Sequence, residues 1–287
     1  MSNLTARVLF AVVAIPVVIG VAYAGGVALA LFLSLVSALA AWEFFRLAGD
    51  PYRPMTMVGV ALAFIVPLGV HGYRTGQFAP PVFALGAVIV LTVFALAIFA
   101  RGVEGHPIGA SATTVFGVLY TAGMLSFAYG LRYHNYALGR VAGTAVLAYP
   151  LVLTWISDSA GFFVGRAIGR HKLIPAVSPG KTVEGAVGAL VFCAVASWCY
   201  AHWVLPWAAL LAVRPVTSLV IGIVISVAVQ AGDLAESLIK REAGRKDSSH
   251  LIPGHGGVLD RIDGMLFALP VAYLVFTFPH VFAPALR

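Results

Sequence analysis

The chain has 287 residues, of which 61% are hydrophobic and only 10% are charged, with a formal net charge of +7. Soluble domains contain about 25% charged residues, so this composition excludes an ordinary soluble protein and indicates an integral membrane protein. The positive charge indicates membrane topology and attraction to anionic headgroups or phosphates, and not a nucleic-acid-binding surface.

Apolar runs long enough to cross a bilayer as helices recur along the chain. Nine are predicted: Val8–Ala24, Val27–Leu47, Met57–Val70, Val82–Ala100, Thr113–Leu131, Val141–Gly169, Thr182–Leu205, Val216–Ile239 and Gly264–Ala283. Because the runs are continuous and do not alternate, we expect an all-α polytopic bundle of about nine transmembrane helices. It would form a single transmembrane domain, in which residues 1–140 supply N-terminal spans and residues 141–287 carry the active site.

Lys and Arg residues in the breaks between the runs predict the orientation. With the N-terminus in the cytoplasm, most of the 18 Lys and Arg residues face the cytoplasm. Five face the other side: Arg74, Arg132, Arg140, Arg214 and Arg287. We therefore expect a cytoplasmic N-terminus and an external C-terminus. The first run ends in Ala22-Tyr23-Ala24, which resembles a signal-peptidase site, but its length and the span that closely follows favour retention.

Charged residues concentrate between the eighth and ninth predicted spans. Four polar side chains with helical spacings of three and four residues lie at the end of the eighth: Asp233, Glu236, Ser237 and Lys240. They form one polar stripe on a helix. An ionised side chain near the bilayer interior costs about 2.5 kcal/mol or more, so this stripe must face protein, a cation or water. Asp260 and Asp263, three residues apart, begin the ninth span.

Paired Asp carboxylates among Lys and Arg suit a divalent cation and the phosphates that it neutralises. Magnesium takes oxygen ligands, typically one or two carboxylates plus substrate phosphate oxygens. In the alternative interpretation, the acids only pair with basic neighbours and cap helices. This alternative stays open for Glu236 and Asp247. It is weaker for Asp233 and Asp260, because surface ion pairing does not explain an acid within a span.

Two loops carry further candidates. In Pro253–Gly257, three glycines around His255 let the backbone approach a ligand and turn N–H groups toward phosphate, although a tight turn would have the same sequence. In the loop at residues 165–185, Gly180-Lys181-Thr182 superficially resembles a phosphate-binding Walker motif, but Pro175 stands where that motif needs Gly.

The second loop follows a span that contains an acid, Asp158. Ser178, Lys181 and Glu184 remain as candidates at the mouth of the seventh span. We expect Thr182 to cap that helix, with Glu184 in its first turn, and Lys181 to contact a phosphate or a base.

The segment "SLIKREAGRKDSSHLIPGHGGVLDRID", Ser237–Asp263, resembles throughout the signature of phosphatidate cytidylyltransferases, and "GDLAES" and "SPGKTVEG" resemble other blocks of that family. The resemblance covers about Ser157–Asp263. It implies transfer of a cytidylyl group from CTP to phosphatidic acid, a requirement for magnesium, metal ligands at Asp233 and Asp260, and a homodimer with one site in each subunit. We expect a bacterial-type inner membrane with the active site on the cytoplasmic side.

On this reading each candidate residue receives a role. Magnesium is held by Asp233 and Asp260, with Asp263 and a second cation as a two-metal option. The other catalytic candidates, which stabilise the triphosphate and the lipid phosphate, are Lys240, Arg241, Lys246 and Arg261. The substrate-binding candidates are Ser178, Lys181, Glu184, Ser237, Asp247, Gly254, His255, Gly256 and Gly257.

Two other functions also place acidic residues in a membrane protein. A CDP-alcohol phosphatidyltransferase also has clustered Asp residues, but its D-G-x-x-A-R pattern is absent, because Asp263-Gly264 is followed by Met265, Leu266 and Phe267. An ion or phosphate transporter predicts acids near the bilayer midplane and repeated, broken helices. Here the acids gather at one face and the sequence has no visible repeat, which disfavours transport.

Overall fold

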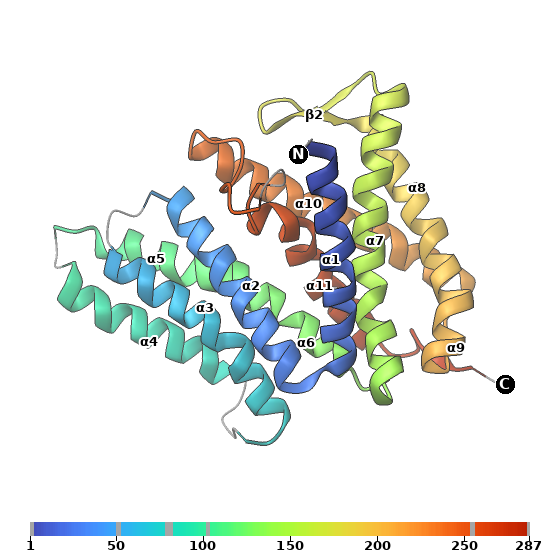
Figure 1. Cartoon of the computed structure of the whole chain (residues 1–287), viewed down its shortest axis with the longest axis horizontal. Helices are drawn as coiled ribbons and strands as arrows, with labels where there is room; N and C mark the ends of the chain where they lie inside the picture. Colours follow the sequence, from blue (N-terminus) through green and yellow to red (C-terminus); the bar gives the residue numbers. More distant parts are fainter. Residues whose placement is uncertain (1–2, 50–52, 78–82, 102–103, 253–255, 286–287) are drawn as a thin grey trace. The chain divides into compact units, whose positions relative to one another are not determined.

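The computed structural model describes residues 3–49, 53–77, 83–101, 104–252 and 256–285. The chain forms two compact units. The first unit comprises Met1–Tyr129 and Glu242–Arg261, and the second comprises Gly130–Arg241 and Ile262–Arg287. Figure 1 shows the order of the helices along the chain.

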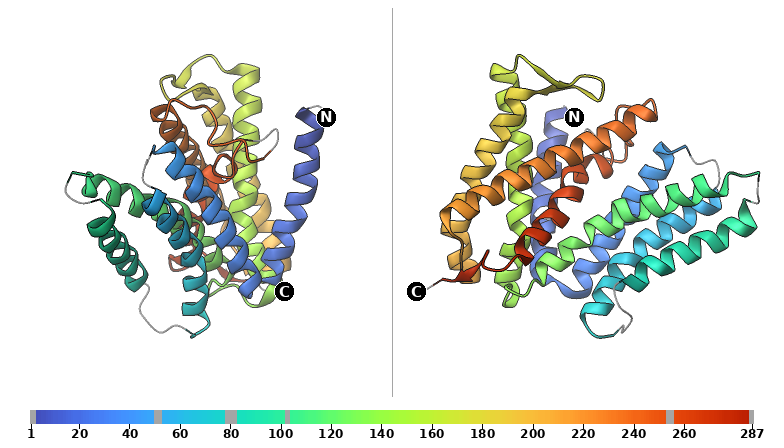
Figure 2. Two further views of the ribbon diagram at one scale, coloured as in Figure 1. Left: turned by 60° about the vertical axis from the view of Figure 1, so that its left-hand side comes forward. Right: turned by 180° about the vertical axis from the view of Figure 1, so that it is seen from behind.

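The first unit is built from apolar helices: α1 (Asn3–Ala24), α2 (Gly26–Leu47), α3 (Arg53–Arg74), α4 (Phe83–Ala100), α5 (Pro107–Val118) and the π-helical turn η1 (Leu119–Gly123). Helices α2 to α5, coloured blue to green in Figure 2, pack side by side. Phe44 and Phe45 at the end of α2 are buried, and the Phe44 ring contacts the rings of Phe116 and Tyr120. This aromatic core fixes the last turns of α2, which carry the polar residues described below.

The second unit contains all or part of each remaining element: α6 (Phe127–Arg132), α7 (Gly139–Ile168), β1 (Lys172–Ile174), β2 (Ser178–Thr182), α8 (Val183–Cys199), the π-helical turn η2 (Tyr200–Val204), α9 (Leu205–Ala209), β3 (Leu211–Ala212), α10 (Pro215–Glu242), α11 (Leu259–Thr277) and β4 (Ala283–Pro284). The first three residues of α11, up to Arg261, belong to the first unit. Helices α7 and α8 lie side by side, and the β1–β2 hairpin joins them (Figure 1). Two further short strands, β3 and β4, pair antiparallel. The hairpin therefore lies at one end of the α7–α8 pair.

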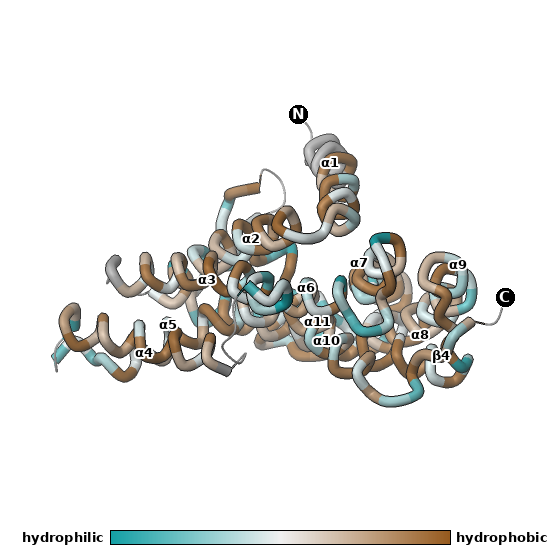
Figure 3. Tube along the Cα trace, turned by 90° about the horizontal axis from the view of Figure 1, so that it is seen from below, coloured by the Kyte–Doolittle hydropathy of each residue, from teal (hydrophilic) through white to brown (hydrophobic). Residues whose placement is uncertain are grey.

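The predicted helical fold class is confirmed. Within the described residues, six helical stretches are long and apolar enough to cross a membrane, and shorter apolar helices lie at Val12–Ala24 and Ala84–Ala100. Figure 3 shows hydrophobic residues along most of the helices. The chain is therefore a multi-pass helical membrane protein, while the exact number of spans and the sides on which the termini lie stay predictions.

Several predicted boundaries were wrong. The third span, predicted at Met57–Val70, is part of a longer helix that covers Arg53–Arg74. The helix of the ninth span begins at Leu259, five residues before the predicted Gly264, so that Asp260 and Asp263 lie inside it. Hydropathy detects the apolar part of a helix, whereas hydrogen bonding and capping decide where the helix ends. The four short strands were not predicted.

Candidate functional site

Three predicted site residues line one pocket of the second unit. This pocket has a volume of about 580 Å³. Its polar side chains come from α7, β2 and α10: Ser157, Asp158, Arg166, Ser178, Lys181, Thr182, Gln230 and Asp233. We call it the hairpin pocket. The fold thus brings Ser178 and Lys181 of the hairpin together with Asp233, and it adds Asp158, Arg166 and Gln230, which had no predicted role in the site.

Asp233 forms an ion pair with Lys181. The Lys181 Nζ lies 2.7 Å from Asp233 Oδ2, and the two side chains are 23% and 34% exposed. An acid in an otherwise apolar helix needs such a partner, because an unpaired charge is strongly disfavoured there. The partner comes from β2, which precedes Asp233 by about 50 residues in the chain. The pair places one positive and one negative group together on the pocket wall.

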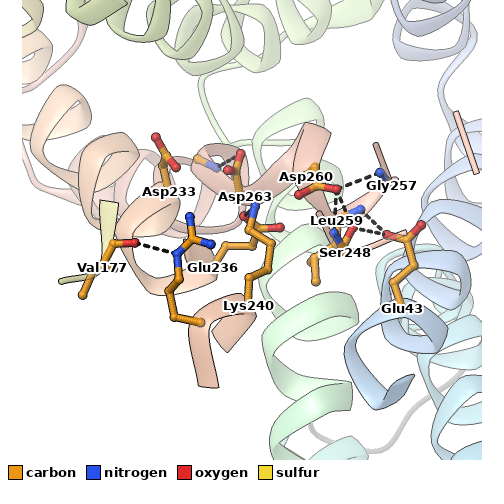
Figure 4. A network of polar contacts seen from close by, with 12 residues as sticks. Glu43, Val177, Asp233, Glu236, Lys240, Ser248, Gly257, Leu259, Asp260 and Asp263 are labelled. Carbon is orange, nitrogen blue, oxygen red and sulfur yellow. Dashed lines mark hydrogen bonds and ion pairs between the residues drawn. The ribbon is translucent and has the colours of Figure 1, made fainter. Parts of the chain in front are cut away.

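Helices α10 and α11 approach each other closely beside Asp233. A Cβ atom added to Gly232 would lie 2.5 Å from the Asp263 carbonyl oxygen and 3.2 Å from Gly264 Cα. Only glycine allows this approach of the two backbones. Asp233 therefore directly follows the α10 residue at this helix–helix contact, and Asp263 is one of the α11 residues that form it. Figure 4 shows both side chains. The backbone N–H of Gly264 donates to Asp263 Oδ1 at 2.8 Å.

Three charged residues near the end of α10 make contacts within the protein: Glu236, Lys240 and Arg241. The fully buried Glu236 carboxylate pairs with Lys240 one turn later. The interpretation of Glu236 as an ion-pair partner is thereby confirmed. The Nε of Arg241 donates to the Val177 carbonyl oxygen at 3.2 Å and ties the turn of the hairpin to α10 (Figure 4). Ser237 is partly buried in the same helix. Lys240 and Arg241 thus stabilise the frame of the site.

The hairpin ends in a capped helix. The Thr182 hydroxyl accepts a hydrogen bond from the Gly185 backbone N–H at 3.1 Å, which confirms the predicted cap of α8. Glu184 accepts a hydrogen bond from the Arg170 backbone N–H at 3.0 Å and contacts His171 Nδ1 at 2.6 Å. The Glu184 carboxylate therefore joins the start of α8 to the end of α7 and holds the base of the hairpin.

In the first unit, Glu43 of α2 is a buried carboxylate that sequence analysis missed. Its side chain is 0% exposed, and four donors lie within hydrogen-bonding distance of its two oxygens. The donors to Oε1 are Ser249 Oγ at 2.6 Å and the Val258 N–H at 3.0 Å; those to Oε2 are Ser248 Oγ at 3.0 Å and the Leu259 N–H at 2.7 Å. Glu43 therefore caps the start of α11 and holds the preceding loop. The sequence contained an indication of this role, because Glu43 is an acid inside the predicted span Val27–Leu47 and such an acid needs a buried partner.

Asp260 belongs to the same network, which we call the carboxylate anchor: Glu43, Ser248, Ser249, Gly257 and Asp260 (Figure 4). Asp260 Oδ2 lies 2.9 Å from the Ser248 N–H, 2.7 Å from Ser248 Oγ and 2.7 Å from the Gly257 N–H. The two backbone N–H donors fix the orientation of this carboxylate, and the single proton of the Ser248 hydroxyl can be donated to Asp260 or to Glu43 at any one time. The Ser248 hydroxyl contacts both Glu43 and Asp260, so it links the two acids of the anchor.

The turn at Gly256 and Gly257 packs against the carboxylate anchor. Gly256 has a φ of +79°, a backbone conformation that glycine adopts much more readily than other residues do. The N–H of Gly257 points to Asp260, and a Cβ on Gly257 would overlap with both Ser248 Oγ and Glu43 Oε2. The backbone at Gly257 therefore closely approaches two side chains of the protein itself, those of Ser248 and Glu43. Gly254 and His255 lie outside the described residues.

We expect Gly257→Ala to lower the free energy of unfolding by about 1–3 kcal/mol, the usual range for overpacking a filled site. Thermal unfolding of the purified protein in detergent measures this. Gly86→Ala in α4 is the matched control, because its Cβ would meet no atom within 4 Å. Equal unfolding temperatures for the two variants would contradict the packing described for Gly257.

The other predicted residues lie at exposed positions. Lys246 and Asp247 are exposed in the first unit, and Arg261 is exposed in α11. Asp260 belongs to the first unit and Asp233 to the second, so an ion shared by these two carboxylates stays a prediction. Across the part of the chain that the structure describes, no group of three or more His, Cys, Asp or Glu side chains is arranged to hold a metal ion.

Comparison with known proteins gives a consistent result. A family model described as "Cytidylyltransferase family" matches residues 5–278. The chain is 44% identical over 152 residues to a phosphatidate cytidylyltransferase of Haemophilus influenzae, which covers 53% of this chain and 51% of the relative. It is 40% identical over 133 residues to the Bacillus subtilis protein of the same name, covering 46% and 48%. The chain thus spans about half the length of these two relatives.

A third relative matches over nearly its whole length. The chain is 27% identical over 269 residues to a phosphatidate cytidylyltransferase of Staphylococcus haemolyticus. This match covers 92% of the chain and 96% of the relative. The similarity therefore includes the N-terminal helices as well as the segment that carries the hairpin pocket and the carboxylate anchor.

Proposed function

Since this chain belongs to the cytidylyltransferase family, we propose that it transfers the cytidylyl group of CTP to phosphatidic acid, forming CDP-diacylglycerol and pyrophosphate. The observation that carries the proposal is the family match over residues 5–278, together with a relative named phosphatidate cytidylyltransferase that aligns with 92% of the chain. The helical membrane fold suits a substrate whose acyl chains stay in the bilayer.

The proposed reaction needs little from a general base. A phosphate monoester has a second pKa of about 6, so phosphatidate is already a nucleophilic dianion at neutral pH. One of its oxygens bonds to the α-phosphorus of CTP, and the bond from that phosphorus to the bridging oxygen of the β-phosphate breaks. The electron pair leaves with pyrophosphate. The protein must align these groups and neutralise their charge.

We assign the triphosphate of CTP to the hairpin pocket. Lys181 has three donors, so its ammonium group can keep Asp233 as a partner while it donates to a phosphate oxygen. Ser178 and Arg166, which line the same pocket, add a hydroxyl and a guanidinium donor. Asp233 would then position Lys181 as well as offer a carboxylate oxygen on the pocket wall.

Magnesium is part of the proposal. The donor type fits, since Asp233 on the pocket wall presents a hard carboxylate oxygen, and magnesium typically takes one or two carboxylates beside substrate phosphate oxygens. Asp233 and Asp263, both of the second unit, would hold the ion, with a second cation as a two-metal option. When bound, magnesium supplies positive charge that neutralises the triphosphate and the departing pyrophosphate.

The proposed activity predicts that purified protein releases pyrophosphate only when CTP, phosphatidate and magnesium are all present. CDP-diacylglycerol should appear in equal amount, as measured by thin-layer chromatography of radiolabelled product. Omission of each component in turn is the control. Absence of pyrophosphate release from folded protein with all three components would overturn the proposed function.

The location and assembly belong to the same proposal. The site would face the cytoplasm from a bacterial inner membrane, and the protein would act as a homodimer with one site in each subunit. Labelling of an Arg245→Cys variant by an impermeant thiol reagent, compared in right-side-out and inverted vesicles, tests the side. Chemical cross-linking in native membranes tests the dimer.

A further inference from the structure

A pocket with a basic lining lies in the first unit. Its volume is about 610 Å³, within the range of about 300–1,000 Å³ that is common for small-molecule sites. We call it the basic pocket. Two segments line it, the last turns of α2 with Trp42 and Arg46 and the loop Arg245–Leu251 with Arg245, Lys246 and His250. Three permanently cationic side chains, those of Arg46, Arg245 and Lys246, and one carboxylate, that of Asp247, line it.

Hydrogen bonds to the buried Glu43 carboxylate connect the two segments that line the basic pocket. Glu43, between Trp42 and Arg46 in α2, is fully buried and accepts a hydrogen bond from Ser249 Oγ of the loop at 2.6 Å. The Ser248 hydroxyl, one residue earlier, contacts the same carboxylate at 3.0 Å. The carboxylate anchor therefore fixes the loop that carries Arg245 and Lys246 onto the helix that carries Arg46. A fixed frame lowers the entropy lost when a ligand is bound.

Arg46 has a defined orientation. Its guanidinium carbon lies 4.7 Å from the centre of the Trp42 ring, a cation–π arrangement. A guanidinium group held by an aromatic face keeps its N–H donors at its edges, where they can bind two oxygens of one phosphate. Trp42 and the exposed Leu251 also give the pocket apolar surface.

We propose that the basic pocket binds a phosphate group of a substrate, with Arg46 as a bidentate donor and Arg245 and Lys246 as supporting charges. This inference rests on the proposed function and deepens it, because it gives the last turns of α2 a direct role in substrate binding. Two sources share this chemistry, the phosphate monoester of phosphatidate and the triphosphate of CTP. The competing explanation for Arg46 is an anchoring charge at the cytoplasmic face, which any cation would satisfy.

The test compares three purified variants: Arg46→Gln, Arg46→Lys and Arg74→Gln. Arg74→Gln is the matched control, since it removes one exposed Arg of the same unit that does not line the pocket. Binding is measured at equilibrium in detergent with two probes, dioctanoyl phosphatidate without CTP and CTP without lipid. Gel filtration and thermal unfolding confirm that each variant is folded.

We expect Arg46→Gln to weaken binding of one probe by about ten- to a hundredfold, the effect of losing charge-assisted hydrogen bonds. Arg46→Lys should also weaken it, because Lys cannot replace the planar fork. Weaker phosphatidate binding assigns the pocket to the lipid headgroup. Weaker CTP binding assigns it to the nucleotide and replaces the assignment of the triphosphate to the hairpin pocket. Wild-type binding of both probes by folded Arg46→Gln would overturn the inference, as would full rescue by Arg46→Lys.

The outcome for the proposed function is separate. If wild-type protein releases pyrophosphate and Arg46→Gln binds both probes normally, only the inference about the basic pocket fails. If wild-type protein binds neither probe and releases no pyrophosphate, the proposed function itself fails, and the inference fails with it.

Discussion

Replacing Asp233 by Asn should lower the rate of pyrophosphate release by at least about a hundredfold, the usual effect of removing one preorganised electrostatic group from an active site. The variant loses the negative charge that pairs with Lys181 at 2.7 Å in the hairpin pocket. It also loses a carboxylate oxygen that would bind magnesium. Folding should persist, because Asn has nearly the size of Asp and its amide oxygen can still accept a hydrogen bond from the Lys181 ammonium group. Steady-state kinetics and thermal unfolding measure the two effects.

Glu104→Gln is the control for Asp233→Asn, since it removes an exposed carboxylate far from the predicted site residues in sequence. It should leave turnover unchanged. If Asp233→Asn keeps near wild-type turnover in saturating magnesium, Asp233 is neither a metal ligand nor a positioning group. If Asp233→Asn loses thermal stability but keeps its turnover, the pair with Lys181 is purely structural.

Replacing Glu43 should strongly destabilise the protein. Each of its oxygens accepts from one hydroxyl and one backbone N–H. In Glu43→Gln the amide NH₂ must face one of those backbone N–H groups, which cannot accept a hydrogen bond. We expect a loss of about 1–3 kcal/mol for one buried unsatisfied donor. Glu43→Ala should lose more, because it leaves both pairs of donors without their acceptor.

Thermal unfolding in detergent tests this order, which is wild type, then Glu43→Gln, then Glu43→Ala. Kinetics at a temperature where all three are folded add a second measurement, since the anchor also holds Ser248 against Asp260. Glu104→Gln again serves as the control for a carboxylate-to-amide change at an exposed position. Unfolding of both Glu43 variants at the wild-type temperature would show that the buried network does not stabilise the fold.

Local features were predicted well from the sequence. Continuous apolar runs indicated helices, because hydropathy over about 20 residues reports on the medium around each segment by itself. The cap of α8 by Thr182 was also predicted correctly, since it depends on residues only three positions apart. The ion pair of Glu236 with Lys240 is local in the same way, one helical turn long.

Partners that are distant in sequence required the tertiary structure. The acid at Asp233 was recognised as needing a partner, but nothing in its neighbourhood identified Lys181 of the hairpin. Glu43 was overlooked, although the rule applied to Asp233 applies to it equally, because its four donors lie more than 200 residues later. Gly257 was interpreted as an approach to a ligand, whereas its space is taken by Ser248 and Glu43.

The sequence by itself therefore determined the helical membrane class, the segment rich in charged residues and the resemblance to a family. These follow from composition, from spacing within a few turns and from a contiguous motif. Only the tertiary structure decided which charges meet: Lys181 with Asp233, and Glu43 with the loop before Asp260. The physical reason is that a buried charge specifies that a partner must exist, while helix packing selects which distant residue supplies it.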